Sequence, residues 1–289
     1  MKAIQFTVPV YGDDLFALLE DKKDNFYGYY HRHEELQITY ILKGRGTIMI
    51  GNIVQSFNQD DVFILKPNEP HMFDKYGAQK VTEEDTIHAI HLFINLDRMT
   101  KFFTLAEFAD LSTYFLQLDA SKRIESSVAR SFRGNFLNLL HKVGIPRFTE
   151  FITLLHTLLQ YRNASISLYS GIRNLIYSDK DGERISSVFK YTLDNFDHDI
   201  SIGEVASLVY MTPTSFCKFF KKHTMKTYIG FLNEVRIEKA CQLLLNKKTE
   251  SISETAFKVG FNNIVHFNRV FKRIMRLSPH SYIQLHTIS

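Results

Sequence analysis

The spacing of hydrophobic residues changes twice along the chain. Residues 26–97 hold short stretches rich in β-branched and aromatic side chains, separated by glycines and prolines. Such stretches predict strands, here at 37–42, 46–50, 61–65 and 88–93. Many short strands in succession indicate a small β-barrel or sandwich.

From residue 99 to about residue 162 the hydrophobic residues recur with the period of a helix. A stripe of leucines shows this best, at Leu154, Leu155, Leu158 and Leu159. Pro146 is expected in or just after a turn between two such helices. The stripe serves either the core of the domain or a dimer surface, and the sequence leaves both uses open.

A polar run that ends at Gly182 marks a boundary between domains. Residues 163–182 have mixed periodicity and predict a linker, whereas residues 183–289 show helical patterning almost throughout. We therefore expect a domain of strands with trailing helices at 1–162, a linker at 163–182, and an all-helical domain at 183–289.

The helical third contains an internal repeat of about fifty residues. The segment Glu204-Val-Ala-x-x-Val recurs as Glu254-Thr-Ala-x-x-Val, and Phe220-Lys-Lys recurs as Phe271-Lys-Arg. An alanine in the middle of each first segment allows two helices to cross closely over a short turn. The repeat therefore predicts two helix-turn-helix motifs.

The second helix of each motif has one aromatic face and one polar face. Thr212-Pro213 is expected to begin the first of these helices, with Thr212 as its N-cap, and residues 260–263 form the turn before the other. Side chains that suit base edges and phosphates lie on the polar faces. They are Thr214, Ser215, Cys217, Lys218, Lys221, Lys222, Asn263, His266, Asn268, Arg269, Lys272 and Arg273.

Length and charge agree with two DNA-facing motifs on one chain. Residues 228–246 predict a connecting helix of roughly 28 Å, near the roughly 34 Å between successive major-groove openings on B-DNA. Residues 183–289 hold 15 lysines and arginines against 9 acids, a surplus of 6. Because the net charge of the whole chain is +4, residues 1–182 carry a net charge of −2. The excess of positive charge is therefore confined to the helical third.

Residues 183–288 resemble the DNA-binding domain of the AraC/XylS family of transcription regulators. The likeness rests on Arg236-Ile-x-x-Ala-x-x-Leu-Leu, Ile252-x-x-x-Ala-x-x-Val-Gly-Phe and Phe267-x-x-x-Phe-Lys-Arg-x5-Pro. The resemblance implies seven helices and double-stranded DNA as the partner. The base-facing residues it implies are Thr214, Cys217, Lys218, His266, Asn268 and Arg269.

The chain departs from this family pattern at three places. Met225 and Arg276 stand where family members often have a glycine after each DNA-facing helix, and a left-handed cap there costs roughly 1 kcal/mol each. Ile283 replaces a family arginine. Ile264 and Val265 give the second DNA-facing helix an apolar edge that suits thymine methyl groups.

Histidines in the strand region form the second cluster of interest. His31 and His33 share one face of a strand with Gln37, and the end of a second strand could bring His71 beside them. With Gly44 and Asp61, residues 28–75 resemble the cupin barrel, so the expected fold class is α+β, with a cupin-like β-barrel before an all-α domain.

Cupin enzymes hold a metal with three histidines and a glutamate, and Gln37 takes the glutamate position here. The cluster serves as a pocket for a small ligand, as a site for a divalent metal on His31, His33 and His71, or as a structural feature. Beyond that metal, no cofactor is expected.

Composition excludes several classes of protein. Two cysteines are too few for a disulfide framework, the polar first residues predict no signal peptide, and no apolar run is long enough to span a membrane. Nucleotide-binding and nucleophile motifs are absent from the sequence, so we expect a regulator and not an enzyme.

The sequence thus predicts a cytoplasmic, dimeric, DNA-binding transcription regulator that responds to a small, sugar-like metabolite held in the N-terminal barrel. A contact with RNA polymerase is left open. The alternative is a metal-dependent cupin enzyme fused to a helical domain.

Overall fold

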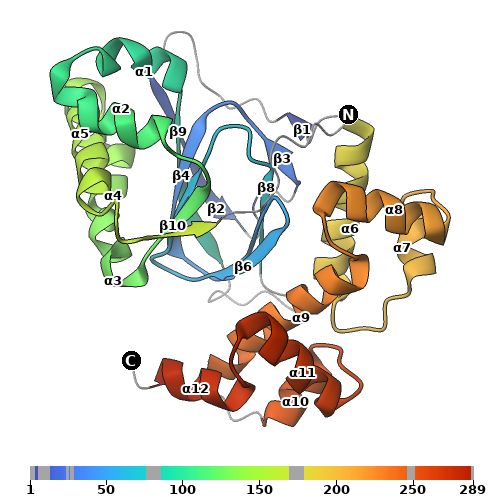
Figure 1. Ribbon diagram of the computed structural model, residues 1–289. Helices are drawn as coiled ribbons and strands as arrows, with labels where there is room; N and C mark the ends of the chain where they lie inside the picture. The colour runs from blue at the N-terminus through green and yellow to red at the C-terminus, as the bar shows by residue number, and fades with distance from the viewer. Residues whose placement is uncertain are drawn as a thin grey trace. The chain divides into compact units, whose positions relative to one another are not determined.

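The computed structural model describes residues 4–5, 14–23, 26, 29–75, 86–168, 179–245 and 251–287. The chain divides into two compact units, formed chiefly by residues 3–173 and by residues 174–289 (Figure 1). We call them the N-terminal unit and the C-terminal unit, and each is described by itself. No helix among the described residues is both long and apolar enough to cross a membrane.

Two sheets, antiparallel apart from one short parallel pair, form the framework of the N-terminal unit (Figure 1). The first has the strand order β1 (Ile4–Gln5), β3 (His31–Arg32), β8 (His71–Lys75), β5 (Gly46–Ile50) and β6 (Ile53–Phe57). The second has the order β11 (Ser165–Leu168), β10 (Ser121–Ile124), β7 (Val62–Leu65), β4 (Leu36–Lys43), β9 (Ile87–Ile94) and β2 (Phe16–Lys23). In the described residues the predicted barrel is therefore open, a cupin-like pair of sheets.

The four predicted strands are confirmed as β4, β5, β7 and β9. Four strands lie outside residues 26–97, where strands were predicted: β1, β2, β10 and β11. The predicted linker at 163–182 contains β11 near its start and the first residues of a helix at its end. Residues 169–178 lie outside the described residues, and the predicted domain limits stay a prediction.

Helices cover the outer face of the larger sheet, where Figure 1 draws them in green. They are α1 (Leu96–Phe103), α2 (Ala109–Leu116), α3 (Ser126–Ala129), α4 (Arg133–His141) and α5 (Gly144–Gln160). Pro146 lies in the first turn of α5, as predicted. Leu154, Leu155 and Leu158 are buried against β4 and β9, so the leucine stripe belongs to the core.

Alternation along β4 separates this core from the space between the sheets. Ile38 and Tyr40 pack on the helix side, and Gln37 and Thr39 point to the other side, because successive side chains of a strand face opposite ways. The same rule applies to β9, where Ile90 and Leu92 join the helix side and leave the residues between them to face inward. Polar residues of the candidate site therefore lie inside the pair of sheets.

Seven helices make up the described part of the C-terminal unit, the number that the family resemblance implied. They are α6 (Asp179–Asn195), α7 (Ile202–Leu208), α8 (Pro213–Thr224), α9 (Tyr228–Leu245), α10 (Ile252–Lys258), α11 (Ile264–Met275) and α12 (Pro279–Thr287). The first helix-turn-helix motif is α7 and α8, and the second is α10 and α11. Helix α9 connects the two motifs (Figure 1).

Each motif begins with the same reciprocal cap. Ser201 accepts a hydrogen bond from the backbone of Glu204, whose carboxylate accepts one in return, and Ser251 with Glu254 repeats the arrangement. The repeated glutamates are thus caps that fix where α7 and α10 start. Ala206 and Ala256 are fully buried where the helices cross, as the repeat predicted.

Candidate functional site

Helix α8 exposes the whole polar face that the sequence predicted. The hydroxyl of Thr212 accepts a hydrogen bond from the backbone N–H of Ser215 at 3.3 Å, and Pro213 occupies the first turn. Phe216 and Phe220 are fully buried. The residues left exposed include Thr214, Ser215, Cys217, Lys218, Lys221 and Lys222.

Helix α11 repeats this arrangement with different side chains. The Asn263 side-chain oxygen accepts hydrogen bonds from the backbone N–H groups of Val265 at 2.8 Å and His266 at 3.1 Å, so it is engaged as the cap. Phe267 and Phe271 are fully buried. Exposed residues include Asn263, His266, Asn268, Arg269, Lys272 and Arg273. All twelve candidates are thus accessible, and their contact with DNA stays a prediction.

Both α8 and α11 end in a left-handed residue that is not glycine. Met225 has φ 57° and Arg276 has φ 61°, and each backbone N–H closes the last turn. Met225 and Arg276 therefore adopt the left-handed backbone conformation that the family glycines would favour. Val265 is 72% exposed at the start of α11, which leaves the predicted apolar edge accessible.

Arg236 of α9 joins the segment between α6 and α7 to the second motif. Its guanidinium donates to the backbone oxygens of Phe196 and His198, each at 2.7 Å, just after α6 ends. The same group lies over the ring of Phe261, in the turn of the second motif. Gly260 fits this junction because a Cβ atom there would lie 2.6 Å from the Phe196 oxygen. In the sequence, Arg236 belongs to a motif of the family resemblance, and no local pattern reveals these partners.

In the N-terminal unit, the sheet brings the three predicted histidines together. His31 and His71 are register partners on β3 and β8, and His33 follows β3 directly. One ring nitrogen from each histidine lies within 4.8 Å of the other two, and all three side chains are buried. The described residues contain this one cluster with the spacing of a metal site.

Backbone carbonyls orient all three rings through Nδ1. The nitrogen-to-oxygen distances are 2.7 Å for His31, 3.0 Å for His33 and 2.8 Å for His71. The accepting oxygens belong to Tyr29, Glu35 and Glu69. Burial lowers the pKa of His31 to about 4, and it lowers the pKa of His33 and of His71 as well. The rings are therefore neutral at pH 7.

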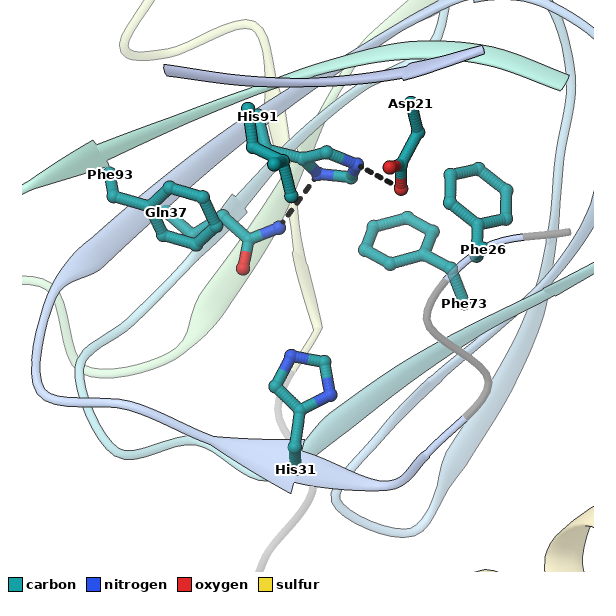
Figure 2. Close-up of a pocket in the computed structure, with 8 residues that line it drawn as sticks. Asp21, Phe26, His31, Gln37, Phe73, His91 and Phe93 are labelled. Carbon is teal, nitrogen blue, oxygen red and sulfur yellow. Dashed lines mark hydrogen bonds and ion pairs between the residues drawn. The ribbon is translucent and has the colours of Figure 1, made fainter. Parts of the chain in front are cut away.

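A buried polar chain runs from Gln37 across the inside of the sheets (Figure 2). The Gln37 amide nitrogen donates to the Thr39 hydroxyl at 2.8 Å and contacts His91 Nδ1 at 3.0 Å. His91 Nε2 lies 3.4 Å from an oxygen of Asp21. Gln37 Oε1 lies 2.8 Å from His33 Nε2, which joins this chain to the histidine cluster.

A small cavity adjoins the cluster (Figure 2). It is lined by Leu19, Asp21, Phe26, His31, Gln37, Phe73, His91 and Phe93. Of the predicted ligand-binding residues, His31 and Gln37 reach this cavity. His91 and Asp21 were not among the predicted residues, although alternation along β9 could have placed His91 beside Phe93.

The cavity measures about 30 Å³, on a scale where one buried water needs roughly 10–15 Å³. It therefore holds about two waters, and a sugar ring would require its walls to move. The three histidines offer neutral nitrogen donors of the kind that zinc, iron, nickel and copper accept. The residues present thus fit a divalent transition metal, which His31, His33 and His71 would hold.

Comparisons with known proteins agree with this architecture. Residues 14–77 match the family of AraC-like ligand binding domains, and residues 205–284 match a helix-turn-helix domain family. An uncharacterized HTH-type transcriptional regulator from Pseudoalteromonas carrageenovora is 38% identical over 34% of this chain and 57% of its own length.

Two further comparisons extend over most of the chain. The uncharacterized HTH-type transcriptional regulator YdeC of Bacillus subtilis is 21% identical over 89% of this chain and 86% of its own. The solved structure of ToxT from Vibrio cholerae aligns with 93% of this chain and 98% of that chain, at 14% identity and a TM-score of 0.34. The chain thus matches an AraC-like ligand binding domain and a helix-turn-helix domain, the two domain types that its motifs predicted.

Proposed function

We propose that this chain regulates transcription by binding double-stranded DNA through α8 and α11, under the control of a small effector bound in the N-terminal unit. The observation that carries the proposal is the pair of capped helices with aromatic residues buried and all twelve polar candidates exposed. Exposed amide and basic side chains at the start of a helix are the groups that read base edges in a major groove.

The histidine-lined cavity supports the sensing half of the proposal. The cavity is mostly apolar and has a few converging polar groups, as ligand pockets do: His31 of the cluster, and Gln37, His91 and Asp21 of the polar chain. The family resemblance suggests a sugar-like effector, but the small cavity favours a smaller molecule. Control of DNA binding also requires that the effector bind two states of the protein with different affinity.

A purely enzymatic role has no support from the comparisons, since the relatives are named as transcription regulators. Homodimer formation, contact with RNA polymerase and a cytoplasmic location stay predictions that accompany this proposal.

The proposal is tested by fluorescence anisotropy of the full chain on its own upstream DNA over a series of salt concentrations. We expect sequence-selective binding that weakens steeply with salt. Arg269→Ala should cost about 1–3 kcal/mol and relax selectivity, whereas Lys221→Ala should weaken binding to all sequences and reduce the salt slope by about 1.

Lys190→Ala provides the matched control, because Lys190 is an exposed lysine of α6 in the same unit. It should leave selectivity unchanged. Absence of selective binding at low salt, with and without candidate effectors, would refute the regulator proposal.

A further inference from the structure

Asp21 places a carboxylate at the cavity between the two sheets (Figure 2). Of the eight described residues that line this cavity, Asp21 is the one acid, and none is a lysine or an arginine. Among the described side chains, His91 is the one group that pairs with this carboxylate. Whether the negative charge of Asp21 is compensated within the chain therefore depends on where the His91 ring carries its protons.

The hydrogen bonds around His91 show that its ring is neutral. The Gln37 amide nitrogen lies 3.0 Å from His91 Nδ1, and because an amide nitrogen can only donate, Nδ1 accepts and carries no proton. The same amide is oriented by its other partners, since its nitrogen donates to Thr39 and its oxygen faces His33. The single ring proton is then on Nε2, 3.4 Å from the carboxylate. A neutral ring can donate to Asp21 but cannot cancel its charge.

Phenylalanine rings form much of the rest of the cavity wall. The ring centroids of Phe26 and Phe73 lie 5.2 Å apart, and those of both rings lie near the His91 ring, at 6.0 Å and 5.7 Å. The face of an aromatic ring is negative, so it attracts a cation and repels an anion. The rings and the carboxylate therefore favour the same sign of charge in the ligand.

The size of the cavity limits the size of the ligand. Its volume of about 30 Å³ holds about two waters, which is also the space of a molecule with about three non-hydrogen atoms. The Asp21 side chain is 16% exposed, so its carboxylate is accessible from solvent, whereas Leu19 and Phe93 add apolar surface to the walls. A short ligand with one charged end and one apolar end fits these walls.

These walls select among the classes of charged ligand. An anion is repelled by the Asp21 carboxylate and by the faces of the rings. Hard ions such as Ca²⁺ and Mg²⁺ need about six or more oxygen ligands, and of the described lining residues only Asp21 and Gln37 carry side-chain oxygens. An organic ammonium ion suits both features, because its N–H groups donate to a carboxylate and its alkyl group packs against phenyl rings.

We propose that the effector of the N-terminal unit is a short alkylammonium ion, with its ammonium group against Asp21 and its alkyl group against Phe26 and Phe73. This inference rests on the proposed function in that it takes the cavity as the effector site and names the class of molecule that binds there. It does not depend on DNA binding.

The test is a ligand-observed NMR titration of the full chain with ethylammonium chloride, at constant ionic strength and with EDTA to keep the three histidines free of metal. A ligand of this size binds with a dissociation constant on the order of 1 mM at best. We expect saturable binding of ethylammonium. Ethanol and acetate are of similar size but are neutral and negative, and they should bind at least about tenfold more weakly.

Asp21→Asn removes the charge and keeps an oxygen that accepts from His91. It should weaken ethylammonium binding at least about tenfold and leave ethanol binding unchanged. Glu20→Gln is the matched control, because it makes the same change at the adjacent residue of β2, where Glu20 pairs with Lys22 and His88. It should leave the affinity unchanged. If circular dichroism shows that Asp21→Asn does not fold, Phe26→Leu replaces it and should weaken ethylammonium binding about threefold.

Three results would overturn the proposal. The first is that ethylammonium does not bind saturably or binds no better than ethanol. The second is that Asp21→Asn, or Phe26→Leu in its place, binds ethylammonium as tightly as the wild-type chain does. The third is that Glu20→Gln loses as much affinity as Asp21→Asn, because the attraction would then come from the general charge of the surface. Anisotropy on DNA without ethylammonium tests the regulator proposal separately, so either proposal can fail without the other.

Discussion

The two helix-turn-helix motifs have the same scaffold and different exposed chemistry. Both begin with a serine and glutamate cap, bury a pair of phenylalanines, and end in a left-handed residue that is not glycine. The exposed charges of α8 are lysines, whereas α11 exposes Arg269 and Arg273 together with amide and imidazole groups. The duplicated scaffold has thus kept its internal contacts while its outer face has changed.

This difference predicts different contributions of the two motifs to DNA binding. Lysine is a point charge that suits phosphates, and arginine and asparagine can make the paired hydrogen bonds that distinguish bases. We therefore expect the second motif to supply more of the sequence selectivity and the first motif more of the salt-dependent affinity. The turns differ too, since Tyr210 has φ 56° and is 93% exposed, whereas its counterpart Gly260 is enclosed by the Arg236 junction.

The largest expected effect comes from breaking that junction. Arg236→Ala removes two charge-assisted hydrogen bonds to backbone oxygens and should lower the free energy of unfolding of the C-terminal unit by about 3 kcal/mol. Chemical denaturation followed by circular dichroism measures this loss. Arg184→Ala is the control, because Arg184 of α6 makes an ion pair at 3.7 Å with Asp181, and its removal should cost less than about 1 kcal/mol. If the two variants lose the same free energy of unfolding, Arg236 stabilises the unit no more than the Arg184 ion pair does.

A smaller effect should follow from blocking the first motif alone. Cys217 is exposed on α8, and burial raises the pKa of the Cys241 thiol and keeps it unreactive. Alkylation with N-ethylmaleimide should therefore modify Cys217 and weaken DNA binding at least about tenfold, since its bulk would displace α8 from the groove. Cys217→Ser should bind DNA and resist the reagent. Unchanged affinity of the alkylated wild-type chain would place Cys217 away from DNA.

The smallest effect tests whether the scaffolds are equivalent. Met225→Gly and Arg276→Gly should each raise the free energy of unfolding by about 1 kcal/mol, because glycine adopts the left-handed conformation without strain. Lys222→Gly, inside α8, should instead lower it by about 1 kcal/mol. If the free energy of unfolding rises for one glycine variant and falls for the other, the two motifs differ in their packing as well.

Local patterns were sufficient for the helical third and for the central strands. The limits of α8 follow from Thr212-Pro213, and its buried face follows from the spacing of Phe216 and Phe220. The strand β10 escaped prediction because Lys122 and Arg123 hide its alternation. The partner of Arg123 is Asp61 at 2.8 Å, far away in the chain, and no local pattern contains that pairing.

The candidate site divides in the same way. His31, His33 and Gln37 are close in sequence, and their spacing on a strand predicted a shared face. His91 and Asp21 reach the cavity through the pairing of β9 with β4 and β2, which are about fifty and seventy residues away. The single strand predicted for His31, His33 and Gln37 is wrong, because His31 lies on β3 of one sheet and Gln37 lies on β4 of the other. The rest of the cavity depends on the register of strands that only the folded sheet defines.

The 18 residues of α9 also fix a rotational phase between the motifs. Each residue of an α-helix turns the chain by about 100° and advances it by about 1.5 Å. Inserting a single residue into α9 would therefore turn α11 by about a quarter of a revolution relative to α8, while both helices kept their caps and cores. Such a chain would fold and yet present its two DNA-facing helices to different sides of the duplex, so the length of α9 is constrained by the helical pitch of its target.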